Sequence, residues 1–153
     1  AQACGLELGK EDERNPMRAT TYGVGELLSR AVKRGCRNFI IGLGGSGTSD
    51  AGIGMLRALV DIFAKGKTFD DAMQTELGEC RFTLACDVDN PLCGENGAAY
   101  VYAPQKGATP QMVELLDRRA KLFAEKSALH YGYDRSCCPG AGAAGGLGYA
   151  FMQ

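Results

Sequence analysis

The stretch "IIGLGGSGTSDAGIGML", from Ile40 to Leu56, joins an apolar run to a second apolar pattern through closely spaced glycines and hydroxyl residues. A short continuous apolar run predicts a strand that is buried on both faces, here over residues 37–44. The pattern that follows predicts a helix with Ser49 or Asp50 as its cap. The inward-facing residues of this helix are expected to be Ile53, Leu56, Val60 and Phe63.

The rest of the chain alternates between helical and extended patterns. Apolar spacing and turn signals predict helices within residues 15–36, within 66–78 and over 109–130, and strands over 81–89 and 98–104. Caps are expected at Thr20 or Thr21 for the first helix and at Thr109, followed by Pro110, for the last. This alternation predicts an α/β fold with a mixed or largely parallel sheet and flanking helices, in a single domain over residues 1–153.

The composition argues against several classes of protein. The formal net charge of −1 provides no basic field for nucleic acid or an anionic membrane, and no apolar run is long enough to span a bilayer. Seven cysteines without a Cys-x-x-Cys, beside a single histidine, argue against a zinc site and a disulfide framework. We expect free thiols in a reducing cytoplasm. The chain begins without Met or a signal-type segment, so we expect that it was cut from a longer protein.

The glycine-rich turn of residues 42–50 favours binding of an anion. Small residues let an anion approach the free N–H groups at a helix start closely. Ser46, Thr48 and Ser49 add hydroxyl donors. A phosphate or carboxylate site is therefore one interpretation, and a tight turn with a helix cap is the other.

The sequence also matches G-x-G-x-x-G twice, from Gly42 to Gly47 and from Gly140 to Gly145. A dinucleotide-binding fingerprint further requires a βαβ unit with an acidic residue after the second strand. No acidic residue at the right spacing follows a convincing strand after the first match, and no strand clearly precedes the second. An NAD-binding oxidoreductase is therefore the less favoured alternative. The second match could still bring its backbone close to a ligand or to another backbone.

A second polar group lies around the strand predicted over 81–89. Asp87 and Asp89 follow its apolar part and share one face, where α/β proteins tend to bind ligands. They could bind a divalent metal, orient a hydroxyl or accept its proton, or they could simply cap the following turn. Gln105 and Lys106 precede a helix N-terminus, where a lysine could meet an anion or could be a solvated surface residue.

Four blocks together resemble the class I glycerate kinase family. In order they are "NPMRATTYGVGELL", "IIGLGGSGTSDAGIGMLRAL", "ACDVDNPLCGENGAAYVYAPQKGATPQMVELLD" and "PGAGAAGGLG". The resemblance covers most of the chain and implies an ATP-dependent kinase that phosphorylates D-glycerate with Mg²⁺ as helper, giving 2-phosphoglycerate, in the cytoplasm. The family has Ala at the position of Gly47, so the resemblance implies substrate or phosphate binding there and no nicotinamide cofactor.

The resemblance also implies roles for individual residues. A kinase must position a hydroxyl in line with the γ-phosphate and neutralise the charge of the transferred group. Lys106 would meet a phosphate or carboxylate, and Asp87 would bind the metal or accept the proton. The other expected binding residues are Gly44, Gly45, Ser46, Thr48, Asp50, Asp89, Asn90 and Gln105.

Two departures limit what the resemblance implies. Family members are longer, and they carry an Asp-Ser-Phe-Lys motif and a later Gly-Glu-Gly motif that this chain lacks. The chain is therefore expected to be one domain of a two-domain kinase, inactive alone, with an apolar docking face that could drive it to form a homodimer. A non-catalytic ligand-binding module on the same scaffold is the alternative.

Overall fold

The computed structural model describes residues 3–6 and 14–153. Its sheet consists of β1 (Asn38–Gly42) and β2 (Arg81–Ala85), which pair in parallel from Asn38 opposite Arg81 to Gly42 opposite Ala85. Parallel neighbours need a crossover connection, and this one runs through three helical elements: α2 (Ile53–Phe63), α3 (Phe69–Met73) and η3 (Glu76–Glu79). The α/β class and the parallel sheet are confirmed.

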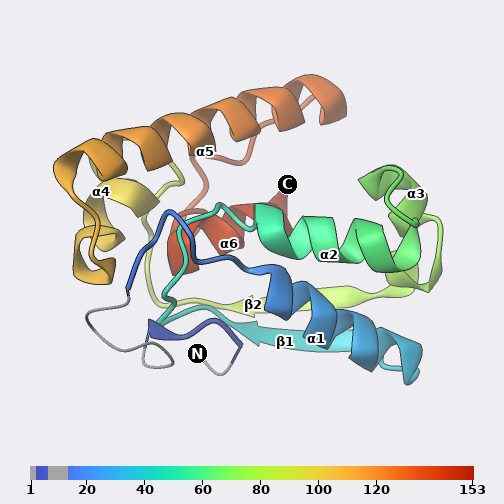
Figure 1. The fold of residues 1–153 in the computed structure, drawn as a ribbon. Coiled ribbons are helices and arrows are strands. Elements are labelled where there is room, and N and C mark those ends of the chain that lie inside the picture. Colours follow the sequence, from blue (N-terminus) through green and yellow to red (C-terminus); the bar gives the residue numbers. More distant parts are fainter. Residues whose placement is uncertain (1–2, 7–13) are drawn as a thin grey trace.

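The remaining helices surround this unit (Figure 1). They are α1 (Tyr22–Lys33), α4 (Ala98–Tyr102), η4 (Pro104–Lys106), α5 (Pro110–Tyr131) and α6 (Ala143–Met152). The expected cap of the last long helix is confirmed, because the Thr109 side chain accepts the N–H of Met112 and Pro110 opens α5. Figure 1 shows both strands pointing toward the side of the molecule where α4 lies. No helix of the described residues is long and apolar enough to cross a membrane.

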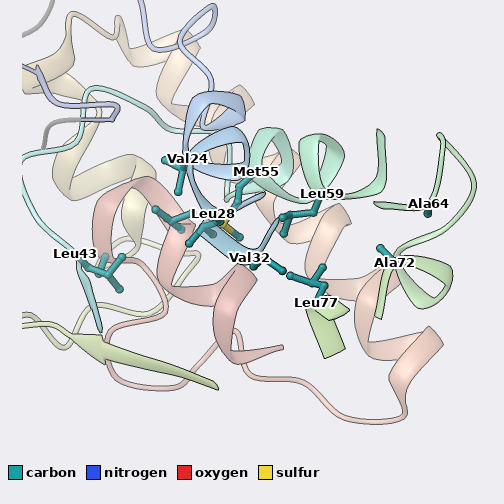
Figure 2. Close-up of a cluster of buried hydrophobic side chains, with 11 residues drawn as sticks. Val24, Leu28, Val32, Leu43, Met55, Leu59, Ala64, Ala72 and Leu77 are labelled. Atoms are coloured by element: carbon teal, nitrogen blue, oxygen red, sulfur yellow. The ribbon is translucent and has the colours of Figure 1, made fainter. Parts of the chain in front are cut away.

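The main core lies between α1, α2 and one face of the sheet. Figure 2 shows Leu28 and Val32 of α1 beside Met55 and Leu59 of α2. Gly25 lets the two helices approach closely, since a Cβ at this position would lie 2.6 Å from the Met55 carbonyl oxygen. The half-buried strand residues that pack against this core are Phe39, Ile41, Phe82 and Leu84.

The expected burial of the first strand on both faces is wrong. Outward-facing and half-buried residues alternate along β1 and β2, and the side chain of Ile40 is 81% exposed. Helices cover only the inner face among the described residues, so the outward residues face solvent. The second strand is also shorter than the predicted range 81–89.

The strand expected over residues 98–104 is wrong as well, because this segment forms α4 and η4. The β-branched and aromatic composition favours a strand. The buried residues, however, are Ala99 and Ala103, which are four apart and pack against Val113 and Leu116 of α5. Helical spacing therefore buries the small residues and leaves Tyr100 and Val101 exposed.

Candidate functional site

A cavity of about 240 Å³ lies where both strands end. This is the edge at which α/β sheets bind ligands. Among the predicted residues, its lining contains Gly44, Gly45, Ser46, Asp87, Gln105 and Lys106. The other lining residues are Leu6, Leu43, Val88, Tyr102, Ala144 and Gly145. The structure thus brings together side chains that the sequence places far apart.

Lys106 is buried in this cavity with a relative exposure of only 2%. Its ammonium group donates to the carbonyl oxygen of Thr48 and lies 3.5 Å from the hydroxyl of Ser49. No carboxylate of residues 3–6 and 14–153 forms an ion pair with it. Burial lowers the pKa of Lys106 to about 8. The interpretation of this lysine as a solvated surface residue is wrong. The nearby charge of Asp50 opposes the lowering of this pKa without forming an ion pair, and a bound anion would supply a direct countercharge.

The loop after β1 lines the same cavity with residues whose backbone N–H groups are free among the described residues. The N–H groups of Gly44, Gly45 and Ser46 have no acceptor in the described part of the chain. The N–H of Leu6 donates to the Gly45 carbonyl, and the N–H of Gly47 donates to the Cys4 carbonyl, so a neighbouring segment holds this loop in place. Free N–H groups beside a cation form a place for an oxyanion.

Thr48 supports this loop from within. It is 3% exposed, and its hydroxyl lies 2.7 Å from the hydroxyl of Ser46, which in turn accepts the N–H of Thr48. Since the Thr48 carbonyl also accepts from Lys106, this residue orients two members of the cavity without lining it.

Asp87 is exposed and follows the end of the neighbouring strand, β2. Its carboxylate has no hydrogen bond or ion pair with any described residue. Burial, together with the nearby charges of Cys86 and Asp87, raises the pKa of Tyr102. Among the described residues, one cavity is therefore lined by a lysine without a carboxylate partner and by an aspartate without a hydrogen-bond donor.

Asp50 lies outside this lining. One of its carboxylate oxygens accepts from Thr20, from Gly54 and from both the N–H and hydroxyl of Thr21, and the other accepts from Gly52. The Thr21 hydroxyl, which was expected to cap α1, accepts the N–H of Met55 instead. The Asp50 side chain therefore ties the beginnings of α1 and α2 together.

The expected free N–H groups at the start of α2 are thus occupied. Gly54 and Met55 donate to the side chains of Asp50 and Thr21, and Ile53 and Leu56 donate to backbone carbonyls. The expectation that this helix start offers free donors is wrong. Ile53 is also 43% exposed instead of facing inward.

Asp89 and Asn90 also lie outside the lining. Asp89 is exposed. The amide of Asn90 donates to the Asn96 carbonyl and accepts from the Tyr102 hydroxyl at 2.5 Å, and its carbonyl accepts the N–H of Gly142. Asn90 therefore fixes Tyr102 and the segment that leads to α6.

Sequence reasoning missed Tyr102, Ala144 and Gly145. Tyr102 lies in the segment that was expected to form a strand. Ala144 and Gly145 belong to the second G-x-G-x-x-G match, for which the sequence indicated only that the backbone could approach a ligand or another backbone closely. That approach is confirmed, because a Cβ at Gly145 would lie 2.0 Å from the Thr48 carbonyl oxygen.

The sequence pattern of the glycerate kinase family matches residues 1–153. The chain therefore belongs to the glycerate kinase family. A glycerate kinase of Haemophilus influenzae is 43% identical to it, over 97% of this chain and 43% of its own length. The glycerate 2-kinase of Escherichia coli is 41% identical, over 99% of this chain and 44% of its own length. This member of the family thus spans less than half the length of these relatives.

A solved structure of the family has the same fold. A crystal structure described as glycerate kinase 2 from Salmonella typhimurium LT2 matches with a TM-score of 0.84 and 38% sequence identity. The match covers 98% of this chain and 44% of that chain.

The first G-x-G-x-x-G match lacks the geometry of a dinucleotide site. β1 ends at Gly42, but α2 begins only at Ile53, and the helix start is closed by Asp50. A dinucleotide fingerprint instead opens the helix directly, so that the pyrophosphate reaches its N-terminus. The geometry agrees with a kinase family and offers no support to an NAD-binding oxidoreductase.

Proposed function

We propose that the protein to which this chain belongs is a glycerate kinase that transfers the γ-phosphoryl group of ATP to D-glycerate. The names of the relatives support this activity, and the Escherichia coli relative is named glycerate 2-kinase, which supports 2-phosphoglycerate as the product. Since the relatives are more than twice as long, we infer that a second domain completes the cleft and that this chain alone is inactive.

One observation carries the proposal. The same cavity is lined by Lys106, whose ammonium group is buried, and by Asp87, whose carboxylate has no partner among the described residues. Lys106 and the N–H groups of Gly44, Gly45 and Ser46 hold an anionic group of the substrate or nucleotide. Asp87 would either accept the proton of the glycerate hydroxyl or bind the metal ion. Gln105 hydrogen-bonds a further hydroxyl. At about 240 Å³ the cavity is smaller than pockets for drug-sized ligands, which run from about 300 Å³, and it suits a small acid.

The donor set fits a magnesium ion that is shared with phosphates. No group of three or more His, Cys, Asp or Glu side chains in the described part of the chain is arranged to hold a metal. Mg²⁺ in kinases needs only one or two protein carboxylates beside phosphate oxygens and waters. Asp87 would supply one of these carboxylates, and Asp89, which lies outside the cavity lining, is the second candidate ligand. The bound ion would neutralise charge on the transferred phosphoryl group.

We place this activity in the cytoplasm. The cysteines are all free thiols, which supports a reducing compartment. The substrate is a small organic acid, and no basic field supports nucleic acid as a partner.

Kinetics of the full-length protein test the proposal. Lys106→Met and Asp87→Asn should each lower kcat/KM for D-glycerate by about 100-fold or more, because each removes a charge at the reacting group. Lys126→Met, on the exposed face of α5, is the matched control and should stay within about twofold. Separation of the phosphoglycerate isomers identifies the product. Lys106→Met kinetics equal to the control, or binding of glycerate without ATP turnover, would contradict the proposal.

A further inference from the structure

The first turn of α6 is left-handed at three consecutive residues. Ala144, Gly145 and Gly146 have φ values of 51°, 71° and 89°. A residue with a Cβ rarely adopts this conformation, so Ala144 is held there by its surroundings. Ala144 and Gly145 both line the cavity that contains Lys106.

The loop that holds Lys106 also fixes this turn. Gly145 packs against the carbonyl oxygen of Thr48, which accepts from Lys106. The Gly145 carbonyl in turn accepts the N–H of Ala51 at 3.0 Å. The turn and the lysine therefore share one support, and their relative position is set by the fold without a ligand.

Two N–H groups of the turn have no acceptor. Ala143 donates to the Gly140 carbonyl and Gly146 donates to the Gly142 carbonyl, but Ala144 and Gly145 donate to no atom of residues 3–6 and 14–153. Consecutive N–H groups in left-handed turns form concavities that bind anions. Residues whose N–H groups have no acceptor in the described part of the chain thus line the cavity from two separate segments, 44–46 and 144–145, and the buried Lys106 lines it as well.

We propose that the Ala144–Gly146 turn is the second wall of the anion site, where the N–H groups of Ala144 and Gly145 bind the oxygens of the group that Lys106 neutralises. The ligand chemistry is a small carboxylate or phosphoryl group. The inference rests on the proposed function for the source of that group, which is glycerate or a phosphate of the nucleotide. Unlike Lys106, these donors do not titrate, so they fix the geometry of the anion at any pH.

Amide NMR of the ¹⁵N-labelled chain gives the first test, with inorganic phosphate and D-glycerate as separate probes. The Ala144 and Gly145 resonances should shift with the same Kd as those of Gly44, Gly45 and Ser46, and Lys106→Met should weaken that Kd at least tenfold. Saturation by only one probe identifies the source. Shifts confined to residues 44–46, or no saturable shift with either probe, would overturn the inference.

The second test removes one donor without changing a side chain. Native chemical ligation at Cys138 joins residues 1–137 to a synthetic 138–153 peptide in which an ester replaces the amide between Ala143 and Ala144. The ester should weaken binding of the saturating probe about tenfold, whereas the all-amide ligation product should bind like the wild type. Equal affinity of the two products, at equal melting temperature, contradicts the inference.

The outcomes separate this inference from the proposed function. If neither anion binds the turn while the full-length protein phosphorylates glycerate, the inference fails and the function stands. If the turn binds phosphate or glycerate while the full-length protein has no kinase activity, the function fails and the anion site stands.

Discussion

At the scale of single residues, Lys106 is the most informative feature of the molecule. Its buried ammonium group has no carboxylate partner among the described residues, so its burial destabilises the fold and other contacts must offset this cost. The sequence predicted a cation here from its place before a helix start. It could not predict the burial, because the Thr48 carbonyl that accepts from Lys106 lies in a distant segment.

The cost of burying the charged Lys106 side chain should be measurable in the free energy of unfolding. The pKa is about 8 in the folded chain and 10.5 ordinarily, so the unfolded chain holds the proton more tightly and the folded state gains stability as pH rises from 8 to 10.5. Lys106→Met should therefore be more stable than the wild type at pH 7, on the order of 1–3 kcal/mol. The difference should shrink by pH 10. Urea unfolding in phosphate-free buffer at both pH values checks this, and a variant less stable at pH 7 would contradict it.

Substitution by alanine should cost much less stability at one glycine of the G-x-G-x-x-G matches than at another. Gly47 has no left-handed backbone, and its added Cβ would lie 3.3 Å from the Cα of Leu6, so Gly47→Ala should cost less than about 1 kcal/mol. Gly145→Ala places a Cβ 2.0 Å from the Thr48 carbonyl oxygen at a φ of +71°, and should cost at least about 2 kcal/mol. Urea unfolding midpoints compare the two. Equal losses would mean that backbone conformation is not the deciding factor.

At the scale of elements, regular patterns were predictable and irregular ones were not. α5 follows from its apolar spacing and from Thr109 and Pro110, all of which act locally. α4 does not, because the burial of Ala99 and Ala103 depends on α5. The prediction of free N–H groups at the start of α2 was wrong for the same reason, because Thr21, which directly precedes α1, accepts the N–H of Met55.

Asp50 offers a prediction at this scale. Asp50→Ala removes the acceptor of five donors that join the starts of α1 and α2, and should destabilise the chain by about 3 kcal/mol. Asp50→Asn keeps the size of the side chain and one acceptor oxygen, so it should lose less stability than Asp50→Ala. Thermal and urea unfolding provide the measurement. Unchanged stability beside lost kinase activity in the full-length protein would instead assign Asp50 to the substrate.

At the scale of the whole molecule, the exposure of one face of the two-stranded sheet is the feature that the sequence could not predict. Its apolar run indicated burial on both faces, and the pattern agrees with parallel sheets, which are covered on both sides. The described chain covers only one face, and the relatives are more than twice as long. We therefore expect that the outer face of β1 is covered in the full-length protein.

The uncovered face should make the isolated chain self-associate. Ile40 is 81% exposed beside Thr83 on the outer face of the sheet. Ile40→Lys should shift sedimentation velocity profiles toward monomer at high concentration, because it replaces the large apolar side chain on the outer face of the sheet by a charge. Leu129→Lys, at an equally exposed site on α5, is the control and should leave the profile unchanged. A wild-type chain that is monomeric at every concentration would contradict this expectation.

The parallel pairing of β1 with β2 also governs how fast the chain can fold. No tight turn can join two parallel strands, so the sheet forms only after the intervening α2, α3 and η3 have brought residue 81 back beside residue 38. Closing so long a segment before any pairing is rewarded slows folding relative to helical bundles. During synthesis, β1 therefore stays unpaired until the residues of β2 have also left the ribosome.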